Sequence, residues 1–265
     1  MPSLITLTTD FGTRDAYVAA MKGTIASIHR DVTFIDISHD IEPQDVMQAA
    51  FVLRGAVPYF PEGTIHLVVV DPGVGTERRA VGVRDGSQYF VGPDNGLLTL
   101  ALAPDEPDHI VQLDKPAFWR ADSPSATFHG RDIFAPVAAH LAAGRTLDDV
   151  GTPVDKLSTL HWALPTIDEH GIQGWVVHVD HFGNCITNIS RQAFEELRDG
   201  RGIKCFAGGA ILHAVHPVYA SVADGDPLAI FNSDGFLEIS VNGGDASSLL
   251  GIRKGAPVNV VFSRS

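Results

Sequence analysis

The chain has 265 residues, of which 45% are hydrophobic and 8% aromatic. This composition is that of a globular protein long enough for two domains, and it excludes a disordered or fibrous chain. Thirty-two acidic residues against 19 lysines and arginines give a formal charge of -13, which repels nucleic-acid phosphates and anionic membrane surfaces. We therefore expect neither nucleic acid nor a membrane as a partner.

The N-terminus and the apolar runs predict a cytoplasmic protein. The chain has no basic stretch at its start and reaches Asp10 before any apolar run of signal-peptide length. The longest strongly apolar run, residues 65–70, is far shorter than the ~20 residues that span a bilayer. Cys185 and Cys205 form no C-x-x-C pair, and we interpret them as buried apolar side chains in a reducing compartment.

Strand-like and helix-like segments alternate through the first 150 residues. In chain order they predict a strand over 4–8, a helix over 16–28, a strand over 32–37, a helix over 44–57, a strand over 64–70, a hairpin of 80–84 and 88–91, and helices over 96–102 and 131–143. Such alternation is typical of a mostly parallel α/β sheet. We therefore expect an N-terminal α/β domain over residues 1–151.

The pattern changes after this domain. Residues 152–171 show no clear period and are rich in Pro, Thr and Asp, which predicts a linker. Short β-like runs between Gly, Asp and Asn turns then follow at 175–179, 203–206, 227–231, 236–241 and 258–262. They predict a smaller all-β domain, a barrel or a sandwich, over residues 172–265.

Asp10 is the first candidate for chemistry, because it follows the first predicted strand. Ligands of open α/β sheets bind outside the carboxyl ends of the strands. The segment TTDFG lacks the G-x-G-x-x-G of a dinucleotide site, which disfavours a Rossmann dehydrogenase. The carboxylate could accept both hydroxyls of a ribose, or it could cap the turn or the following helix.

Two more clusters lie in the same predicted domain. Asp71 ends a strand and leads into a glycine-bearing loop that closes on Arg78 and Arg79. An arginine keeps a nearby carboxylate ionised and oriented, but a tight turn with an exposed salt bridge has the same pattern. His129 precedes a helix that starts near Asp132; it suits proton transfer near neutral pH, or it is hydrogen-bonded to the backbone at the helix start.

The predicted β domain has one cluster suited to a flat polar ligand, in the segment DHFGN at 180–184. Phe182 could stack on a base, and Asn184 could read the edge of that base because an amide offers a donor and an acceptor. An Asx-rich β-turn with a buried phenylalanine explains the same residues. Both interpretations stay open on spacing alone.

Six segments occur in the order seen in one superfamily. They are TTDFG (8–12), DPGVGTERR (71–79), PDNGLLT (93–99), FHGRD (128–132), DHFGNCITNI (180–189) and FNSDGFLEISVNGG (231–244). From residue 4 to about residue 262 the chain therefore resembles the S-adenosylmethionine-dependent fluorinases, chlorinases and hydroxide adenosyltransferases. The resemblance implies an N-terminal α/β domain, a C-terminal β-barrel, and a homotrimer with active sites between the N-domain of one subunit and the C-domain of its neighbour.

The resemblance also implies roles for individual residues in binding S-adenosylmethionine. It assigns Asp10 to the ribose hydroxyls, Phe182 and Asn184 to the adenine, Asp180 and Ser233 to the methionine end, and Asn95 and Asn188 to further substrate contacts. A carboxylate opposite the methionine ammonium makes a charge-assisted pair.

The hydrolase branch of this superfamily resembles the chain in its catalytic set of Asp71, Arg78 and His129. Halide-using relatives carry Tyr at the position of Asp71 and, in the fluorinase, at that of His129; the fluorinase has Ser at the position of Gly130, whereas chlorinase-like enzymes share the glycine. An ionised Asp71 would repel a halide, but a water can donate a hydrogen bond to Asp71 or His129 and lose a proton as it attacks.

The expected activity is therefore hydrolysis of S-adenosyl-L-methionine to adenosine and L-methionine. Because the leaving group is a neutral thioether, we expect no cofactor and no metal. Whether Asp71 or His129 accepts the proton stays open. The alternatives are a chlorinase that forms 5′-chloroadenosine, a metal-dependent phosphohydrolase with ligands Asp10, Asp71 and His129, and a non-catalytic protein that binds S-adenosylmethionine or adenosine and has no need of the catalytic set.

Overall fold

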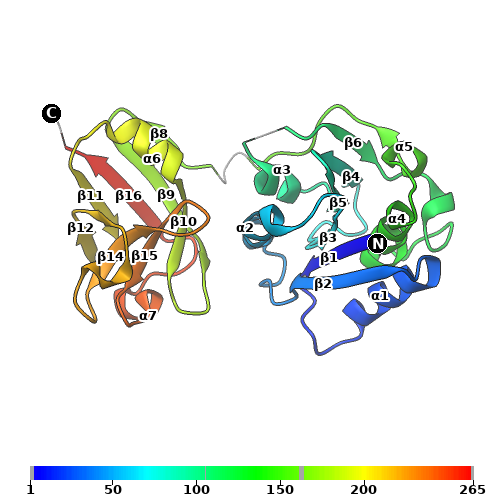
Figure 1. Ribbon diagram of the computed structural model, residues 1–265, viewed down its shortest axis with the longest axis horizontal. Helices are drawn as coiled ribbons and strands as arrows, with labels where there is room; N and C mark the ends of the chain where they lie inside the picture. The colour runs from blue at the N-terminus through cyan, green and yellow to red at the C-terminus, as the bar shows by residue number, and fades with distance from the viewer. Residues whose placement is uncertain (1–2, 105, 161–163, 264–265) are drawn as a thin grey trace. The chain divides into compact units, whose positions relative to one another are not determined.

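The computed structural model describes residues 3–104, 106–160 and 164–263. The chain divides into two compact units, Met1–Leu160 and His161–Ser265 (Figure 1). Among the described residues, no helix is both long and apolar enough to cross a membrane.

The first unit is built on a seven-stranded sheet of order β2-β1-β3-β5-β4-β6-β7. Its strands are β1 (Ser3–Thr9), β2 (Val32–Ser38), β3 (Ile65–Val69), β4 (Ala80–Asp85), β5 (Gln88–Pro93), β6 (His109–Gln112) and β7 (Thr152–Pro153). Strands β2, β1, β3 and β5 are parallel, and β4, β6 and β7 are each antiparallel to the preceding strand of the order. Only β4 and β7 therefore run against the common direction, and the predicted mostly parallel sheet is confirmed.

Helices cover both faces of this sheet (Figure 1). They are α1 (Tyr17–Ile28), α2 (Val46–Ala56), α3 (Leu97–Leu102), α4 (Ala135–Ala142) and α5 (Leu147–Val150), with short helical turns η1 (Val57–Tyr59), η2 (Pro116–Phe118) and η3 (Gly130–Phe134). Helices α1 and α4 share one apolar cluster with Leu67 of β3, and α2 and α3 share another with Val68. Successive residues of β3 thus face opposite layers, as in a parallel strand buried on both sides.

The segment 152–171, predicted as a linker, is partly strand. β7 extends the first sheet beside β6, and β8 (Thr166–Asp168) pairs with β9 of the second unit. Every residue of both short strands is exposed, so the strands lack the apolar alternation by which a strand is recognised in a sequence. The boundary between the units, after Leu160, falls inside the segment, and residues 161–163 lie outside the described residues.

The second unit is mainly β, with sheet order β12-β11-β16-β9-β10-β15-β14-β13. Its elements are β9 (Gly171–Val179), β10 (Cys185–Ser190), α6 (Arg191–Arg198), β11 (Ile203–Ala207), β12 (Ala210–Leu212), β13 (Val215–His216), η5 (Tyr219–Ser221), β14 (Pro227–Phe231), β15 (Phe236–Val241), α7 (Ala246–Leu250) and β16 (Pro257–Phe262). Strand β12 also contacts β14, so the sheet curls back on itself into a nearly closed barrel. The predicted C-terminal β-barrel is confirmed.

Both cysteines are free and buried in the core of the second unit. Burial raises the pKa of the Cys185 and Cys205 thiols to about 12. Because the thiolate is the reactive form, both side chains are chemically inert at neutral pH. Their interpretation as apolar core residues is confirmed.

His66 is a fully buried histidine in β3. Its Nδ1 lies 2.8 Å from Thr6 Oγ1, and its ring stacks on Phe90 with centroids 4.9 Å apart. Burial lowers the pKa of His66 to about 4, against a smaller opposing effect of a hydrogen bond with Gln88. The folded protein therefore holds this imidazole neutral.

This histidine makes the fold sensitive to acid. In the unfolded chain its pKa returns to 6.5, so between pH 6.5 and about 4 the unfolded state binds the extra proton and stability falls. The loss amounts to roughly 3 kcal/mol by pH 4. We expect His66→Gln, which cannot titrate, to show a correspondingly shallower decline in urea-unfolding free energy over this window. Equal declines in the two proteins would contradict the prediction.

Candidate active site

Asp10 and Asp71 lie at the same edge of the first sheet, because they follow β1 and β3, which are neighbouring parallel strands. A cavity of about 290 Å³ opens at this edge. Both carboxylates line it together with His129, which precedes η3, and with Gln44. The structure therefore brings together residues that are far apart in the sequence, at the position where open α/β sheets bind ligands.

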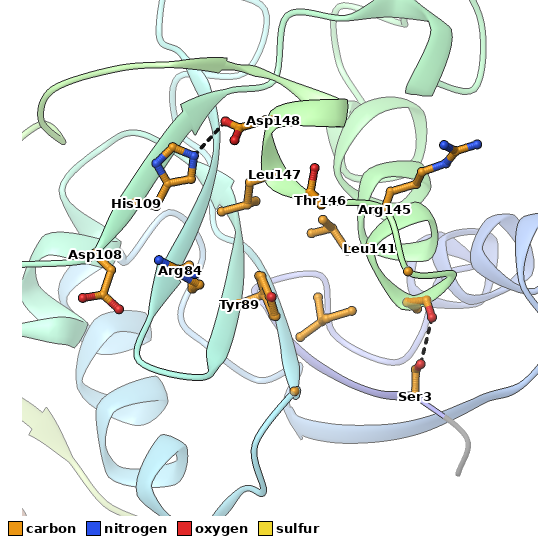
Figure 2. A pocket seen from close by; sticks show the side chains of 14 residues that line it. Ser3, Arg84, Tyr89, Asp108, His109, Leu141, Arg145, Thr146, Leu147 and Asp148 are labelled. Atoms are coloured by element: carbon orange, nitrogen blue, oxygen red, sulfur yellow. Dashed lines mark hydrogen bonds and ion pairs between the residues drawn. The ribbon is translucent and has the colours of Figure 1, made fainter.

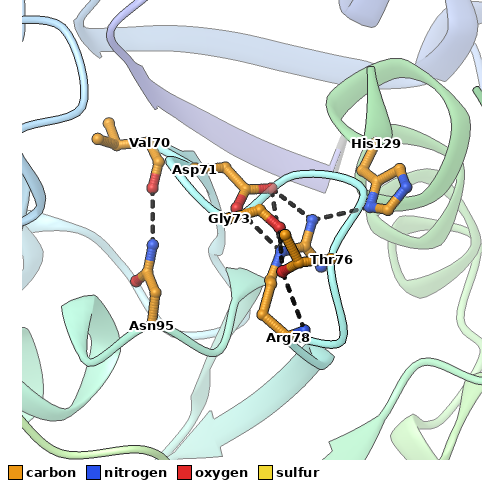
Figure 3. Close-up of polar contacts among 7 residues, drawn as sticks. All are labelled: Val70, Asp71, Gly73, Thr76, Arg78, Asn95 and His129. Atoms are coloured by element: carbon orange, nitrogen blue, oxygen red, sulfur yellow. Dashed lines mark hydrogen bonds and ion pairs between the residues drawn. The ribbon is translucent and has the colours of Figure 1, made fainter. Parts of the chain in front are cut away.

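Asp71, Arg78 and His129 form one hydrogen-bonded group (Figure 3). Arg78 Nε donates to Asp71 Oδ1 at 2.9 Å and to Oδ2 at 3.1 Å, and Nη2 also donates to Oδ2. The same Nη2 lies 2.8 Å from His129 Nδ1. The side chains of Arg78 and Asp71 are only 9% and 6% exposed, so this ion pair is largely buried in the wall of the cavity.

The guanidinium fixes the protonation of His129. An arginine has donors only, so His129 Nδ1 must accept the bond from Arg78 and the ring proton of the neutral imidazole must be on Nε2. Burial, followed by the charge of Arg78, lowers the pKa of His129, against opposing effects of Asp71 and Asp132. At neutral pH the ring is therefore an uncharged donor through Nε2.

Gly75 allows the loop of Asp71 and Arg78 to approach the segment before His129. Its φ is +77°, in the left-handed region that favours glycine, and a Cβ there would lie 2.4 Å from Ala126 O. A side chain at this position would push the two loops apart. The Arg78–His129 contact depends on this approach.

We expect Gly75→Ala to lower turnover because displacement of either loop breaks the contact between Arg78 and His129. The matched control is Gly63→Ala, since Gly63 has nearly the same φ, +78°, but open space around it. Both variants bear the left-handed strain of about 1–2 kcal/mol, whereas only Gly75→Ala should lose activity, by tenfold or more. Steady-state kinetics and thermal unfolding measure the two effects, and equal turnover in both variants would contradict this role.

The helix predicted over 131–143 begins differently from a regular α-helix. Its first turn, η3, is π-helical and continues directly into α4. Asp132 in this turn is 3% exposed and accepts from Arg131 Nε at 2.7 Å and from Ser125 N at 2.9 Å. These bonds, with that of Arg131 the largest cause, lower the pKa of Asp132. The carboxylate thereby ties the loop before His129 to the start of the helix.

Asp10 is engaged by the main chain of a residue that the sequence analysis passed over. Gln44 N donates to Asp10 Oδ2 at 2.8 Å, and Gln44 has a φ of +67°, unusual for a residue with a side chain. The predicted helix over 44–57 in fact starts at Val46, where Asp45 accepts from Gln48 N as its N-cap. Asp45, a preferred N-cap residue, was the available signal for this later start.

The two arginines of the glycine-bearing loop have separate partners. Arg79 binds Asp94, whose side chain is 2% exposed, and donates to Lys156 O at 2.8 Å. Asn95 also bonds within the first unit. Its Nδ2 donates to Val70 O at 2.9 Å (Figure 3). Its Oδ1 accepts from Leu97 N at 3.2 Å. Asn95 therefore fixes the main chain beside the loop of Asp71 and Arg78, and it is not among the residues that line the cavity.

The DHFGN turn of the second unit follows β9. Asp180 Oδ1 accepts from the backbone N of Phe182 and of Asn184, each at 2.9 Å, and its Oδ2 accepts from Asn184 Nδ2 at 2.9 Å. This is an Asx-type turn, but Phe182 is 74% exposed and therefore free to stack on a ligand. The alternative of a buried phenylalanine is wrong.

The remaining candidates of the second unit differ in their environment. Ser233 is exposed in the β14–β15 turn, with Oγ 3.5 Å from Asp234 Oδ1. Asn188 lies in β10, where its Oδ1 accepts from Trp175 N at 3.0 Å and supports the pairing with β9. Ser233 is thus accessible to a ligand, whereas Asn188 has a structural bond.

Glu238 is a buried carboxylate that the sequence analysis did not single out. It is 3% exposed and accepts from Tyr219 Oη at 2.8 Å and from Ser240 Oγ at 2.6 Å. Burial raises the pKa of Glu238 against the opposing effect of the hydrogen bonds from Ser240 and Tyr219, and the charges of Asp180 and Asp234 raise it slightly further. Its alternation in β15 predicts a strand face shared with Ser240, but it does not predict the bond from Tyr219, which lies in the distant turn η5.

A larger cavity, of about 560 Å³, lies at the opposite edge of the first sheet (Figure 2). Ser3 and Tyr89, near the starts of parallel strands, line it with Arg84 and with His109, whose Nε2 lies 2.9 Å from Asp148 Oδ1. Amino ends of parallel strands are not the usual ligand site. None of the residues predicted for chemistry lines this cavity, so the smaller one is the candidate active site.

Comparisons with known proteins agree over nearly the whole chain. Family models of the SAM hydroxide adenosyltransferase N-terminal and C-terminal domains match residues 5–151 and 174–259. A protein of Thermus thermophilus named (R)-S-adenosyl-L-methionine hydrolase is 41% identical, over 95% of this chain and 97% of its own. One of the same name from Methanocaldococcus jannaschii is 35% identical, over 98% and 96%.

The chain is also similar to a fluorinase, at lower identity, and to a solved structure. A protein of Actinopolyspora mzabensis named fluorinase is 30% identical, over 98% of this chain and 97% of its own. A crystal structure of an uncharacterized conserved protein from Thermotoga maritima superposes with a TM-score of 0.87 at 38% identity, covering 97% of this chain and 99% of the other. Similarity to the hydrolases therefore exceeds similarity to this fluorinase.

Proposed function

Because the chain belongs to the SAM hydroxide adenosyltransferase family, we infer that it hydrolyses S-adenosyl-L-methionine to adenosine and L-methionine. The observation that carries this inference is the group of Asp71, Arg78 and His129 on the cavity at the carboxyl edge of the sheet. The relatives are named for the (R) epimer at the sulfonium, and we propose the same preference here.

We propose that Asp71 accepts the proton of the attacking water. The carboxylate has about four lone-pair positions, and the bonds from Arg78 leave capacity for a water. His129 is the weaker candidate, because its Nδ1 already accepts from Arg78 and its Nε2 carries the ring proton. His129 Nε2–H instead suits donation to the water oxygen, which would orient a lone pair toward C5′.

The reaction needs little else from the protein. The water oxygen forms a bond to ribose C5′ as the C5′–S bond breaks, the sulfonium becomes the neutral thioether of methionine, and one proton is released. No general acid is required, and we propose that the reaction uses no metal or cofactor. Arg78 beside Asp71 also disfavours the phosphohydrolase alternative, since a guanidinium repels a metal cation at the same carboxylate.

Substrate binding is proposed to combine both units. Asp10, at the edge of the first sheet, suits the ribose hydroxyls. The exposed Phe182 suits stacking on adenine, with Asn184 Oδ1 as an acceptor because its Nδ2 is engaged by Asp180. Asp180 and Ser233 suit the methionine end.

We further propose a homotrimer in which each site joins the first unit of one subunit to the second unit of its neighbour. The proposal rests on the family resemblance. Analytical ultracentrifugation should give three times the chain mass of 28.3 kDa. Mixed assemblies of Asp71→Asn and Phe182→Ala chains should turn over substrate faster than either variant alone, since some sites then combine two intact halves. A lack of recovery would contradict the shared site.

Product analysis tests the proposed function. The protein, treated with a chelator, is incubated with S-adenosylmethionine of known epimer composition in chloride and in chloride-free buffer. We expect adenosine and methionine in equal amounts in both buffers, with the (R) epimer consumed first. Formation of 5′-chloroadenosine would make the protein a chlorinase, and recovery of intact substrate would make it a binding protein.

A further inference from the structure

Three aromatic side chains form a cluster on the wall of the candidate active site. Phe11 follows Asp10, Tyr17 is the first residue of α1, and Phe128 precedes His129; all three line the 290 Å³ cavity. The ring centroids lie 5.6 Å apart for Phe11 and Tyr17, 5.8 Å for Phe11 and Phe128, and 5.3 Å for Tyr17 and Phe128. We call these residues the aromatic cluster.

The cluster is held in place but remains accessible. The Arg131 guanidinium lies over the Phe128 ring at 5.1 Å, and Asp132 fixes that guanidinium and balances its charge. Phe11 and Phe128 are half-buried, whereas Tyr17 is 49% exposed and its ring can be reached by a ligand. The rings are therefore positioned before any ligand arrives.

The proposed reaction determines which part of the substrate meets these rings. In-line attack requires the water oxygen about 3–3.5 Å from C5′ with the sulfur on the far side, so the sulfonium lies roughly 5 Å from the water. If Asp71 and His129 hold the water, the sulfonium falls within the same small cavity. Apart from the neutral pair of Asp71 and Arg78, the charge lining this cavity is that of Asp10, which favours a cation.

We propose that the aromatic cluster selects the positively charged sulfonium of the substrate over the neutral thioether of S-adenosylhomocysteine-like nucleosides. An aromatic face attracts a cation within about 6 Å through its quadrupole, as in the aromatic cages that recognise quaternary ammonium groups. A thioether has no such charge and gains only the ordinary apolar contact. The inference rests on the proposed function for the placement of the sulfonium.

Paired binding measurements test this selectivity. Dissociation constants for S-adenosylmethionine and S-adenosylhomocysteine are measured by calorimetry in an Asp71→Asn background, which limits turnover during the titration. We expect Tyr17→Leu, which keeps apolar area but removes the ring, to weaken S-adenosylmethionine binding about fivefold. S-Adenosylhomocysteine binding should change by less than twofold. Phe128→Leu should act in the same direction.

Two controls separate a ring effect from a structural one. Tyr17→Phe keeps the ring and should keep the selectivity, and Tyr59→Leu removes a 77% exposed tyrosine from η1 and should affect neither ligand. Equal weakening of both ligands by Tyr17→Leu would overturn the proposal, because the ring would then be a general apolar wall. Loss of selectivity in Tyr17→Phe would also overturn it, because the hydroxyl would then be responsible.

The proposed function is measured separately in the same series. Wild-type protein is assayed for adenosine formation from S-adenosylmethionine. Selectivity in binding without adenosine formation would support the aromatic cluster and refute the hydrolase. Adenosine formation with equal weakening of both ligands would support the hydrolase and refute the cluster.

Discussion

Replacement of Asp71 by Asn is expected to lower turnover on the order of 100-fold while leaving substrate affinity nearly intact. The amide oxygen can still accept from Arg78, so the loop should keep its conformation, but the side chain no longer accepts a proton at neutral pH. The kcat from single-substrate kinetics and the Kd from calorimetry measure the two quantities independently.

A matched control for this variant is Asp94, which follows β5 and binds Arg79, the neighbour of Arg78 in the chain. Asp94 is a buried carboxylate paired with Arg79, as Asp71 is with Arg78, but it does not line the cavity. Asp94→Asn should therefore keep turnover within a few-fold of the wild type. Unchanged turnover in Asp71→Asn would remove this carboxylate from the mechanism and leave His129 as the acceptor.

Replacement of Arg78 by Met is expected to damage both stability and turnover. It leaves the Asp71 carboxylate, only 6% exposed, without its counter-ion, and loss of one partner of a buried ion pair costs about 3–5 kcal/mol. It also removes the donor that fixes His129 Nδ1, so the ring can adopt the other tautomer. Urea unfolding and kcat at a temperature where the variant is folded measure these effects.

Arg79→Met is the matched control for Arg78→Met, because it also removes the counter-ion of a buried carboxylate. That carboxylate is Asp94, whose side chain is 2% exposed. Arg79 is itself 32% exposed, so its loss should destabilise somewhat less than that of Arg78. Turnover of the folded Arg79→Met protein should stay near the wild-type value. A similar loss of turnover in both variants would mean that Arg78 acts only through the stability of the loop.

Much of the fold was predictable because buried strands and helices require apolar residues at regular spacings in the sequence. The buried strands β1 and β3 and the helix α1 were recognised within one or two residues of their observed bounds. The sequence predicts a linker where the exposed strands β7 and β8 lie, because no apolar pattern distinguishes a short exposed strand from a loop. The π-helical turn η3, which precedes α4, leaves no signature in residue type.

The candidate site was predictable only in part. Strand order explains why Asp10 and Asp71 share an edge, but their spacing in the sequence does not define their roles, which the family resemblance implies. The contact of Arg78 with His129 joins residues 51 positions apart and depends on two loops meeting at Gly75. Such contacts between loops follow from tertiary packing and not from the local sequence pattern. The same holds for the left-handed backbone conformation of Gln44, whose N–H donates to Asp10.

The most direct test of the account is to follow the oxygen atom. The protein is incubated with S-adenosylmethionine in ¹⁸O-labelled water, and the nucleoside product is analysed by mass spectrometry with fragmentation of the ribose. We predict adenosine that carries ¹⁸O at the 5′-oxygen, formed by wild type and about 100-fold more slowly by Asp71→Asn. Unlabelled adenosine, or any other 5′-substituted nucleoside, would contradict attack of water on C5′.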